Sequence, residues 1–266
     1  MNIFFHELKT YRKSTFIWII ALSLITIMFL SIYTSFTKDV TASKKLLESL
    51  PYAVKQGLGI SINSFFTIYG LFAYIYLYVL LAGAVQAMNL GVGVLSKEIS
   101  GKTADFLLTK PVSRTSVLAQ KIGAVTVLLI ITNIVYIAIA YVTARLIVKS
   151  ALDIKLFMLI ALTLIFVQVI FMSIGILLSV CIPKIKSVIS VTLPTVFAFF
   201  IIGAIGAIVG NQTVRYITPF KFFDSNYIIA NRSYEVKYIV LEAILVIVML
   251  GLSFVVFIRK DVRAAA

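Results

Sequence analysis

The chain has 266 residues, of which 61% are hydrophobic, and a mean hydropathy of +1.08. A soluble globular domain is about 45–50% apolar, so this excess cannot be buried in one soluble core and excludes that class. The net charge of +14 does not indicate a nucleic-acid partner, because the basic residues are scattered over every loop, and attraction to anionic lipid headgroups explains them.

Six apolar runs in the chain are each long enough to cross a bilayer, which requires about 20 helical residues. Inside lipid every backbone amide needs a partner within its own segment, so these runs are expected to be helices. The sequence therefore predicts an all-α, polytopic membrane protein in which residues 1–266 form one transmembrane domain. The predicted spans lie at about residues 16–36, 65–90, 117–142, 156–182, 188–209 and 238–258.

Residues 1–15 precede the first span, and they are predicted to form a short helix in the membrane interface. Phe4, Leu8 and Tyr11 fall at i, i+4 and i+7 with charged residues between them, as in an interfacial amphipathic helix. The alternative is a basic segment that only flanks the span. The apolar run that follows is too long for the core of a signal peptide and lacks a small-residue cleavage site, so we expect it to be retained.

The predicted second span has an aromatic-rich face that includes Tyr69, Phe72, Tyr76 and Tyr78. Tyrosines near span ends anchor helices at the membrane–water interface. The same face is also a candidate wall for the path of an amphipathic substrate, and Tyr69 and Tyr76 are its candidate lining residues.

Residues 91–116 form the predicted loop after the second span, and they contain Gly101-Lys102-Thr103, which is how a phosphate-binding loop ends. Such a loop requires a glycine five residues before its Gly-Lys pair, and it follows a buried strand. Here that position is Ser96, and the preceding run is the tail of a membrane helix. We therefore expect the chain itself to bind neither ATP nor another cofactor.

Local signals instead predict two short helices in this loop, joined at Gly101. Thr103 is a candidate N-cap of the second helix, Pro111 ends it, and Ser113 caps the third span. The second helix would present residues 106–108, Phe-Leu-Leu, as an apolar ridge among charged residues. Such a ridge is typical of a docking element, and an ordinary loop with lipid-facing leucines is the alternative.

The predicted fifth span combines Pro194, which can kink a helix, with Gly203, Gly206 and Gly210. The last two glycines form a G-x-x-x-G pair, and small residues let helices approach closely. These four residues are candidates for a subunit interface or a transport pathway. Packing within one subunit is equally compatible with the pattern.

Residues 210–235 form the predicted loop before the sixth span, and a short helical or re-entrant plug is expected there on the outer side. Glu242 is the carboxylate that we place inside a span, and an acid within a membrane is a functional candidate by default. Because Glu242 lies one turn into its helix, its side chain can instead reach the headgroups or pack between helices.

Residues that carry out catalysis or bind metals are scarce in this chain. It has one cysteine, Cys181, and one histidine, His6, so neither an internal disulfide nor a metal site of the usual His and Cys patterns is expected. The chain is therefore not expected to be an enzyme. Four polar residues in or near the spans are expected to hydrogen-bond between helices: Gln86, Asn89, Asn133 and Gln168.

The orientation of the chain follows from its loops. An even number of spans places both termini and the loop 91–116 on one side of the membrane. Lys and Arg occur in nearly equal numbers near the span ends on the two sides, but their density at the termini favours cytoplasmic termini.

The segment Glu98–Arg114, EISGKTADFLLTKPVSR, resembles the signature of the ABC-2 family of ATP-binding-cassette permeases, E-x-x-x-G-T-x-x-x-L-L-x-x-P-V-S-R. Lys102 departs from that signature, since it stands between the glycine and the threonine. Weaker similarities to the family occur at residues 47–60, 218–224 and 257–262, and the six-span layout also fits.

The resemblance implies a permease subunit of the bacterial cytoplasmic membrane that forms half of a transmembrane pathway and works as an exporter. It implies two partners: a second permease subunit, identical or different, and a separate cytoplasmic ATPase that uses ATP and Mg²⁺. The loop after the second span would be a coupling helix in a groove of the ATPase, and the fifth span would lie near the subunit interface or the pathway. The implied docking residues are Glu98, Gly101, Lys102, Thr103, Phe106, Leu107, Leu108, Pro111, Ser113 and Arg114.

Two other functions remain open at this level. One is a non-transporting membrane partner of an ATPase, of the sensor or immunity type, and the other is a free-standing secondary carrier. Inverted repeats, or broken helices in matching positions of the two halves, would favour the carrier, and neither is evident in the sequence.

Overall fold

The computed structural model describes residues 3–38, 40–57, 65–100, 113–147, 152–182 and 184–259. The regular elements in these ranges are all helical, and six of the helices are long and apolar enough to cross a membrane. The all-α class and the six predicted spans are thus confirmed. The six helices are α1 (Ile3–Lys38), α5 (Ile68–Ser100), α7 (Arg114–Ile147), α8 (Ile154–Cys181), α9 (Val188–Val209) and α11 (Val236–Arg259).

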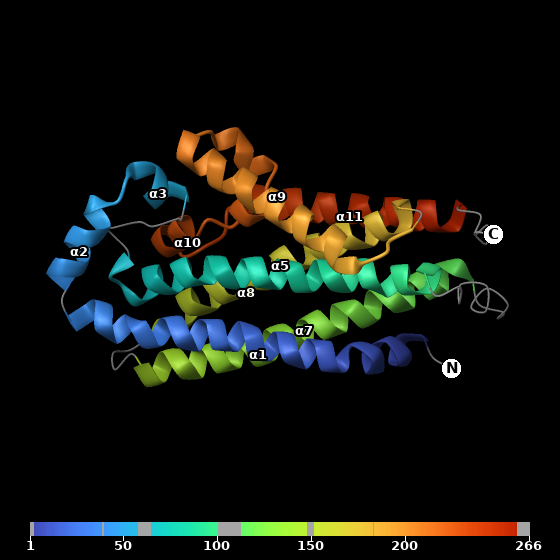
Figure 1. Ribbon diagram of the computed structural model, residues 1–266, viewed down its shortest axis with the longest axis horizontal. Coiled ribbons are helices and arrows are strands. Elements are labelled where there is room, and N and C mark those ends of the chain that lie inside the picture. The colour runs from blue at the N-terminus through green and yellow to red at the C-terminus, as the bar shows by residue number, and fades with distance from the viewer. Residues whose placement is uncertain are drawn as a thin grey trace.

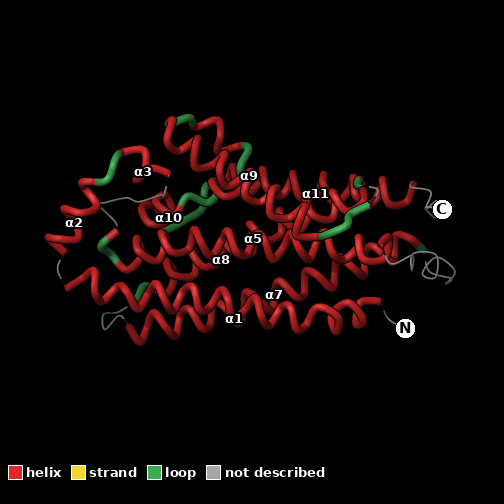
Figure 2. The backbone as a smooth tube through the Cα atoms, viewed as in Figure 1, coloured by secondary structure: helices red, strands yellow, loops and turns green. Residues whose placement is uncertain are grey.

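The long helices form a bundle elongated along one axis, as Figures 1 and 2 show. The start of α1, the end of α5, the start of α7 and the end of α11 lie at one end, which we call the terminal end. Three short helices lie at the opposite end: α2 (Val40–Ser49), α3 (Tyr52–Gly57) and α10 (Ser225–Asn231). Both chain termini therefore belong to the same end, as an even number of spans predicts.

The loop before the sixth span contains helical pieces, as predicted. They are the short 3₁₀ helices η1 (Gln212–Tyr216) and η2 (Pro219–Lys221), followed by α10. Asp224 begins α10, because its side chain accepts a hydrogen bond from the backbone N–H of Asn226. The two short helices α2 and α3, in the connection after the first span, were not predicted from the sequence.

The N-terminal segment does not form a separate interfacial helix, which corrects the prediction for residues 1–15. From Ile3 onward it is the beginning of α1, which continues without a break to Lys38. Glu7, Tyr11 and Thr15 are buried at i, i+4 and i+8, so this face packs on other helices. The amphipathic pattern therefore indicated the right helix, but its buried face meets protein.

The second span is longer than predicted, because α5 runs ten residues past Leu90 to Ser100. The added turns are held by a close crossing of α5 over α8. A Cβ atom on Gly91 would overlap the carbonyl oxygen of Met172, and one on Gly175 would lie 2.8 Å from the carbonyl oxygen of Met88. Residues 91–100 of the predicted loop are thus helical.

Replacing Gly175 with alanine is predicted to destabilise the bundle by about 1–3 kcal/mol, because the added methyl group forces the two backbones apart. The matched control is Gly251→Ala, where an added Cβ has no neighbour within 4 Å. Thermal unfolding in detergent should show a lower midpoint for Gly175→Ala alone. Equal midpoints for the two variants would contradict the close crossing.

Candidate functional site

Most of the predicted docking residues, from Gly101 to Pro111, lie in the range 101–112, outside the described residues. The side chain of Glu98 is outside them as well. Ser113 and Arg114 are described, and they stand where α7 begins. The hydroxyl of Ser113 accepts a hydrogen bond from the backbone N–H of Ser116 at 3.3 Å, so its predicted capping role is confirmed.

The two helices beside this range are fixed to the bundle. Arg114 donates from Nη1 to the backbone carbonyl of Ile258 at 3.2 Å, which joins the start of α7 to the end of α11. Ser96 lies inside α5 and is buried. The position where a phosphate-binding loop needs its first glycine is therefore within the last turns of a long helix, which supports the exclusion of such a loop.

A buried ion pair lies at the terminal end of the bundle, between α1 and α7. The ammonium group of Lys121, which is 0% exposed, donates to Oε1 of Glu7 at 2.6 Å and to the backbone carbonyl of Val94 at 2.9 Å. One turn along α5, the Nζ atom of Lys97 lies 3.7 Å from the ring centroid of Tyr11. We call these five residues the Glu7–Lys121 cluster, and they tie α1 to both α5 and α7.

The Glu7–Lys121 cluster was not predicted from the sequence, although the sequence contains one signal of it. Lys121 falls inside the predicted span at 117–142, and a charged residue within a span usually has a partner and a role. The partner was hidden because Glu7 is 114 residues away in sequence. Only the packing of α1 on α7 brings the two charges together.

A network of polar side chains crosses the interior of the bundle. Gln86 of α5 donates to Thr132 of α7 at 2.9 Å, and Gln168 of α8 donates to Gln86 at 3.1 Å. Asn133 of α7 donates to Oε1 of Gln168 at 2.6 Å. The predicted hydrogen bonding between helices is thus confirmed for Gln86, Asn133 and Gln168, and the buried amides specify how three helices align.

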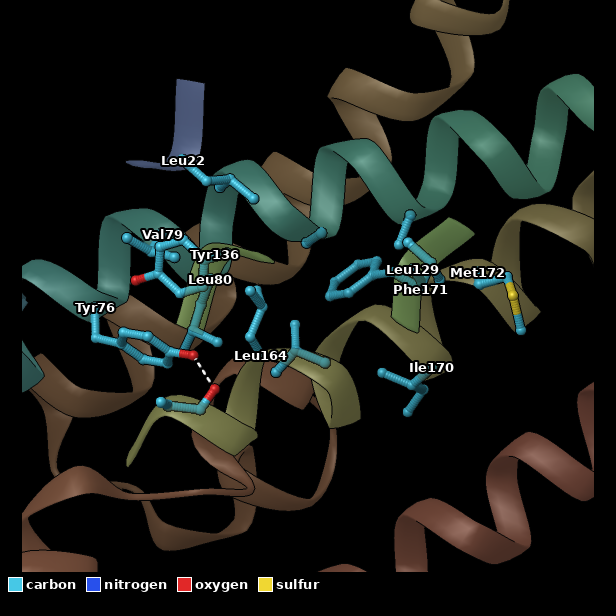
Figure 3. Close-up of a cluster of buried hydrophobic side chains, with 14 of the residues drawn as sticks. Leu22, Tyr76, Val79, Leu80, Leu129, Tyr136, Leu164, Ile170, Phe171 and Met172 are labelled. Carbon is cyan, nitrogen blue, oxygen red and sulfur yellow. Dashed lines mark hydrogen bonds between the residues drawn. The ribbon is translucent and has the colours of Figure 1, made fainter. Parts of the chain in front are cut away.

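The aromatic face of α5 is part of the chain's own core. Tyr76 is completely buried, packs on Tyr136 with ring centroids 6.3 Å apart, and donates its hydroxyl hydrogen to the carbonyl of Ala161. Figure 3 shows it among the core side chains that include Leu164. Tyr69 accepts a hydrogen bond from the backbone N–H of Asp153. Tyr76 is therefore a core residue, which corrects its assignment to a pathway wall.

The glycines of α9 have different environments from those expected. A Cβ on Gly203 would lie 3.2 Å from Cγ2 of Thr218, and one on Gly206 would lie 2.5 Å from Cγ1 of Val214. Both glycines thus make room for η1 and η2 of the same chain, which is the alternative of packing within one subunit.

Gly210 ends α9 with φ of 72°, a left-handed conformation that glycine adopts easily. It belongs to a helix end and not to a helix–helix contact. Pro194 lies within α9 as predicted.

Glu242 lies on the buried face of α11, together with Tyr238 and Ser253. The residue is only 4% exposed, so its side chain does not extend along the surface to the headgroups. The snorkelling role is corrected by this burial, and the packing role is supported. Its Oε2 atom has no hydrogen-bond partner among the described residues.

A second ion pair, between Arg215 and Glu235, fixes the loop before α11. Arg215 of η1 donates to Oε1 of Glu235 at 2.6 Å, and its guanidinium lies 4.4 Å from the ring centroid of Tyr238. Burial alone would raise the pKa of Glu235, but hydrogen bonds from Arg215 and Lys237 outweigh it and lower the pKa below its usual value. The carboxylate form is therefore stabilised in the folded protein.

This pair gives a testable pH dependence. A depressed carboxyl pKa contributes stability above the unfolded-state value and loses it as the pH falls through the folded-state value. Arg215→Met is thus expected to lower stability by about 1 kcal/mol at pH 7, and the difference from the parent should begin to shrink as the pH falls below the ordinary pKa of 4.5 and shrink further toward the depressed folded-state pKa. Thermal unfolding of both proteins from pH 3 to pH 7 measures this, and a difference as large at pH 3 as at pH 7 would contradict the pairing.

Comparison with known protein families adds the deciding observation. A family model described as "ABC-2 family transporter protein" matches residues 1–262. The chain belongs to this family. A search of the curated proteins found no match.

The match confirms the predicted resemblance to the ABC-2 family and covers nearly the whole chain. The ABC-2 chain is a transmembrane component of a transport system, and its six apolar helices make it a multi-pass membrane protein. In such systems the ATP-binding-cassette ATPase is the partner of the permease. Among the described residues, no group of three or more His, Cys, Asp or Glu is placed to hold a metal ion.

Proposed function

We propose that this ABC-2 chain is half of the transmembrane pathway of an exporter in the bacterial cytoplasmic membrane, with both termini in the cytoplasm. It pairs with a second permease subunit, identical or different, and a separate cytoplasmic ATPase uses ATP and Mg²⁺ to drive it. The observation that carries this proposal is the family match over residues 1–262, together with six helices that can span a membrane.

The proposed docking element is the segment Glu98–Arg114, which contains the family signature. The apolar residues Phe106, Leu107 and Leu108 would supply contact area, and the charged residues Glu98 and Arg114 would set the register. The helices on either side support this role. α5 and α7 are 33 and 34 residues long, so each can carry a displacement from the terminal end to the opposite end of the bundle.

The second permease subunit would pack on the outward face of α9. Two helices are poorly covered by their own chain: 17% of the apolar stretch of α9 and 11% of that of α11 are buried, compared with 61% for α8. Ile201, Ile205 and Ile208 are exposed at i, i+4 and i+7, whereas Gly203 and Gly206 are buried. The proposed interface therefore uses the isoleucine face, and the two glycines orient that face by holding η1 and η2.

ATP turnover tests the division of labour. The purified chain in liposomes is expected to show no ATP hydrolysis, and hydrolysis should appear when the ATPase encoded with it is added. Lys102→Ala is the informative control, because it removes the lysine of the apparent phosphate-binding sequence. Turnover by the chain alone that survives stringent purification and disappears in Lys102→Ala would overturn the proposal.

A further inference from the structure

The Glu7–Lys121 cluster joins three helices at a particular level of the bundle. Lys121 is seven residues from the start of α7, and Val94 is six residues from the end of α5. At 1.5 Å per residue, the cluster lies about 10 Å from both helix ends that adjoin the proposed docking segment. Glu7 is in the second turn of α1, so the cluster also includes a residue near the start of the first membrane-spanning helix, at the same end of the bundle.

The contacts in this cluster are directional, and the Lys121 side chain is completely removed from water. Lys121 has no exposed surface, and two of its three ammonium hydrogens are directed at Glu7 and at the Val94 carbonyl. Separating these groups without water would leave a buried charge unpaired, which is strongly unfavourable. The Lys97–Tyr11 contact adds a second link between α5 and α1. Motion of α5 or α7 at this level must therefore carry α1 with it.

The outer face of α1 offers little to hold the helix in place at this level. Phe5 is 65% exposed, and Lys9 and Lys13 are exposed as well, so this face is not packed against another described helix. Further along α1, the described residues include another side-chain hydrogen bond to α7, which joins Thr26 and Tyr136 at 3.0 Å. Thr26 is 19 residues after Glu7, or about 28 Å along a helix. The cluster thus gives the first turns of α1 a directional attachment to α5 and α7.

We propose that the Glu7–Lys121 cluster couples the first span to the docking segment, so that an ATPase-driven displacement of the ends of α5 and α7 moves α1 as well. Glu7 and Lys121 are then positioning residues, which transmit motion and touch neither nucleotide nor substrate. This inference rests on the proposed function, because it assumes that an ATPase acts on the segment between α5 and α7.

The test compares two reporters in the complex with its ATPase, in a background where the single cysteine is replaced, Cys181→Ser. Thr115→Cys reports on the start of α7, and Lys9→Cys reports on α1, and both positions are exposed. The rate of maleimide labelling is measured without nucleotide and with ATP plus vanadate. In the parent protein both rates should change by a factor of about three or more, as expected for a shift between two states.

The decisive variant is Glu7→Gln with Lys121→Met, which removes both charges together and leaves neither unpaired. It should keep the nucleotide response at position 115 and lose the response at position 9. Lys13→Met, an exposed lysine on the same helix, is the control and should keep both responses. A response at position 9 that survives in the double variant would overturn the inference. No response at position 115 in the parent would overturn the proposed function and this inference with it.

If the double variant does not fold, a variant with a smaller expected effect can be used in the same experiment. Lys97→Met removes the contact with the Tyr11 ring but leaves the ion pair in place. It should reduce the response at position 9 by about half, because one of two links between α1 and its neighbours remains. An unchanged response at position 9 in Lys97→Met would count against transmission through the cluster.

Discussion

Replacing Phe106 and Leu107 with aspartate is expected to release the ATPase from this permease while the six-helix bundle stays folded. Both residues belong to the proposed docking ridge, and two new carboxylates would have to be buried without partners in the interface. Interface residues of this kind contribute about 2 kcal/mol or more each, so the affinity should fall by about a thousandfold. Co-purification of the ATPase with tagged permease measures the loss.

The control for this experiment places two aspartates at the opposite end of the bundle, Ala53→Asp with Val54→Asp in α3. Both positions are exposed, so the added charges meet solvent or headgroups. This variant should retain the ATPase at the parental ratio. Stoichiometric ATPase on the Phe106→Asp, Leu107→Asp variant would show that the ridge does not make the contact.

Lys121→Met is expected to lower the free energy of unfolding by about 3–5 kcal/mol, because the Glu7 carboxylate is then buried without its cation. The double variant with Glu7→Gln should recover most of this loss, since the two remaining side chains carry no charge. Thermal unfolding in detergent measures the four corners of the cycle, and a coupling energy near zero would contradict the buried ion pair.

Lys13→Met is the matched control for that cycle. It removes a positive charge from an exposed position of α1 and should change stability by no more than about 0.5 kcal/mol. A loss as large as that of Lys121→Met would indicate a general effect of charge on the helix rather than the loss of one contact.

The membrane spans could be predicted from sequence because each depends on local composition. The fifth span was predicted at residues 188–209, and α9 has these bounds. The predicted bounds of a span are wrong where a contact between residues far apart in the sequence extends the helix. α5 continues past Leu90, where Gly91 fits against the backbone of α8, and α1 includes the residues before the predicted first span, where Glu7 has a partner in α7. Neither contact is visible in the sequence near the residue concerned.

Glycine and tyrosine patterns were ambiguous for the same reason. The sequence directed attention to Gly206 and Gly210, whereas the crossing of two spans depends on Gly91 and Gly175. Which glycines matter depends on which helices are neighbours, and spacing within one helix does not determine that. In the sequence, Tyr76 belongs to an aromatic-rich face, so it was a candidate for lining a pathway. In the structure its hydroxyl donates a hydrogen bond to a backbone carbonyl of α8, and its ring is buried.

The candidate site likewise has one part that the sequence predicts and one part that it does not. The family signature could be recognised because its residues are consecutive, from Glu98 to Arg114, and the family match over residues 1–262 confirms the family. The Glu7–Lys121 cluster could not be assembled from sequence, because its members come from three helices.

The most direct test of the central claim is to tag the permease, extract it from its native membrane in a mild detergent, and identify the co-purifying proteins by mass spectrometry. The account predicts a cytoplasmic ATPase with a complete phosphate-binding loop, present in the parent and absent from the Phe106→Asp, Leu107→Asp variant. A chain that comes out alone in every detergent tried would contradict the account and favour a free-standing carrier.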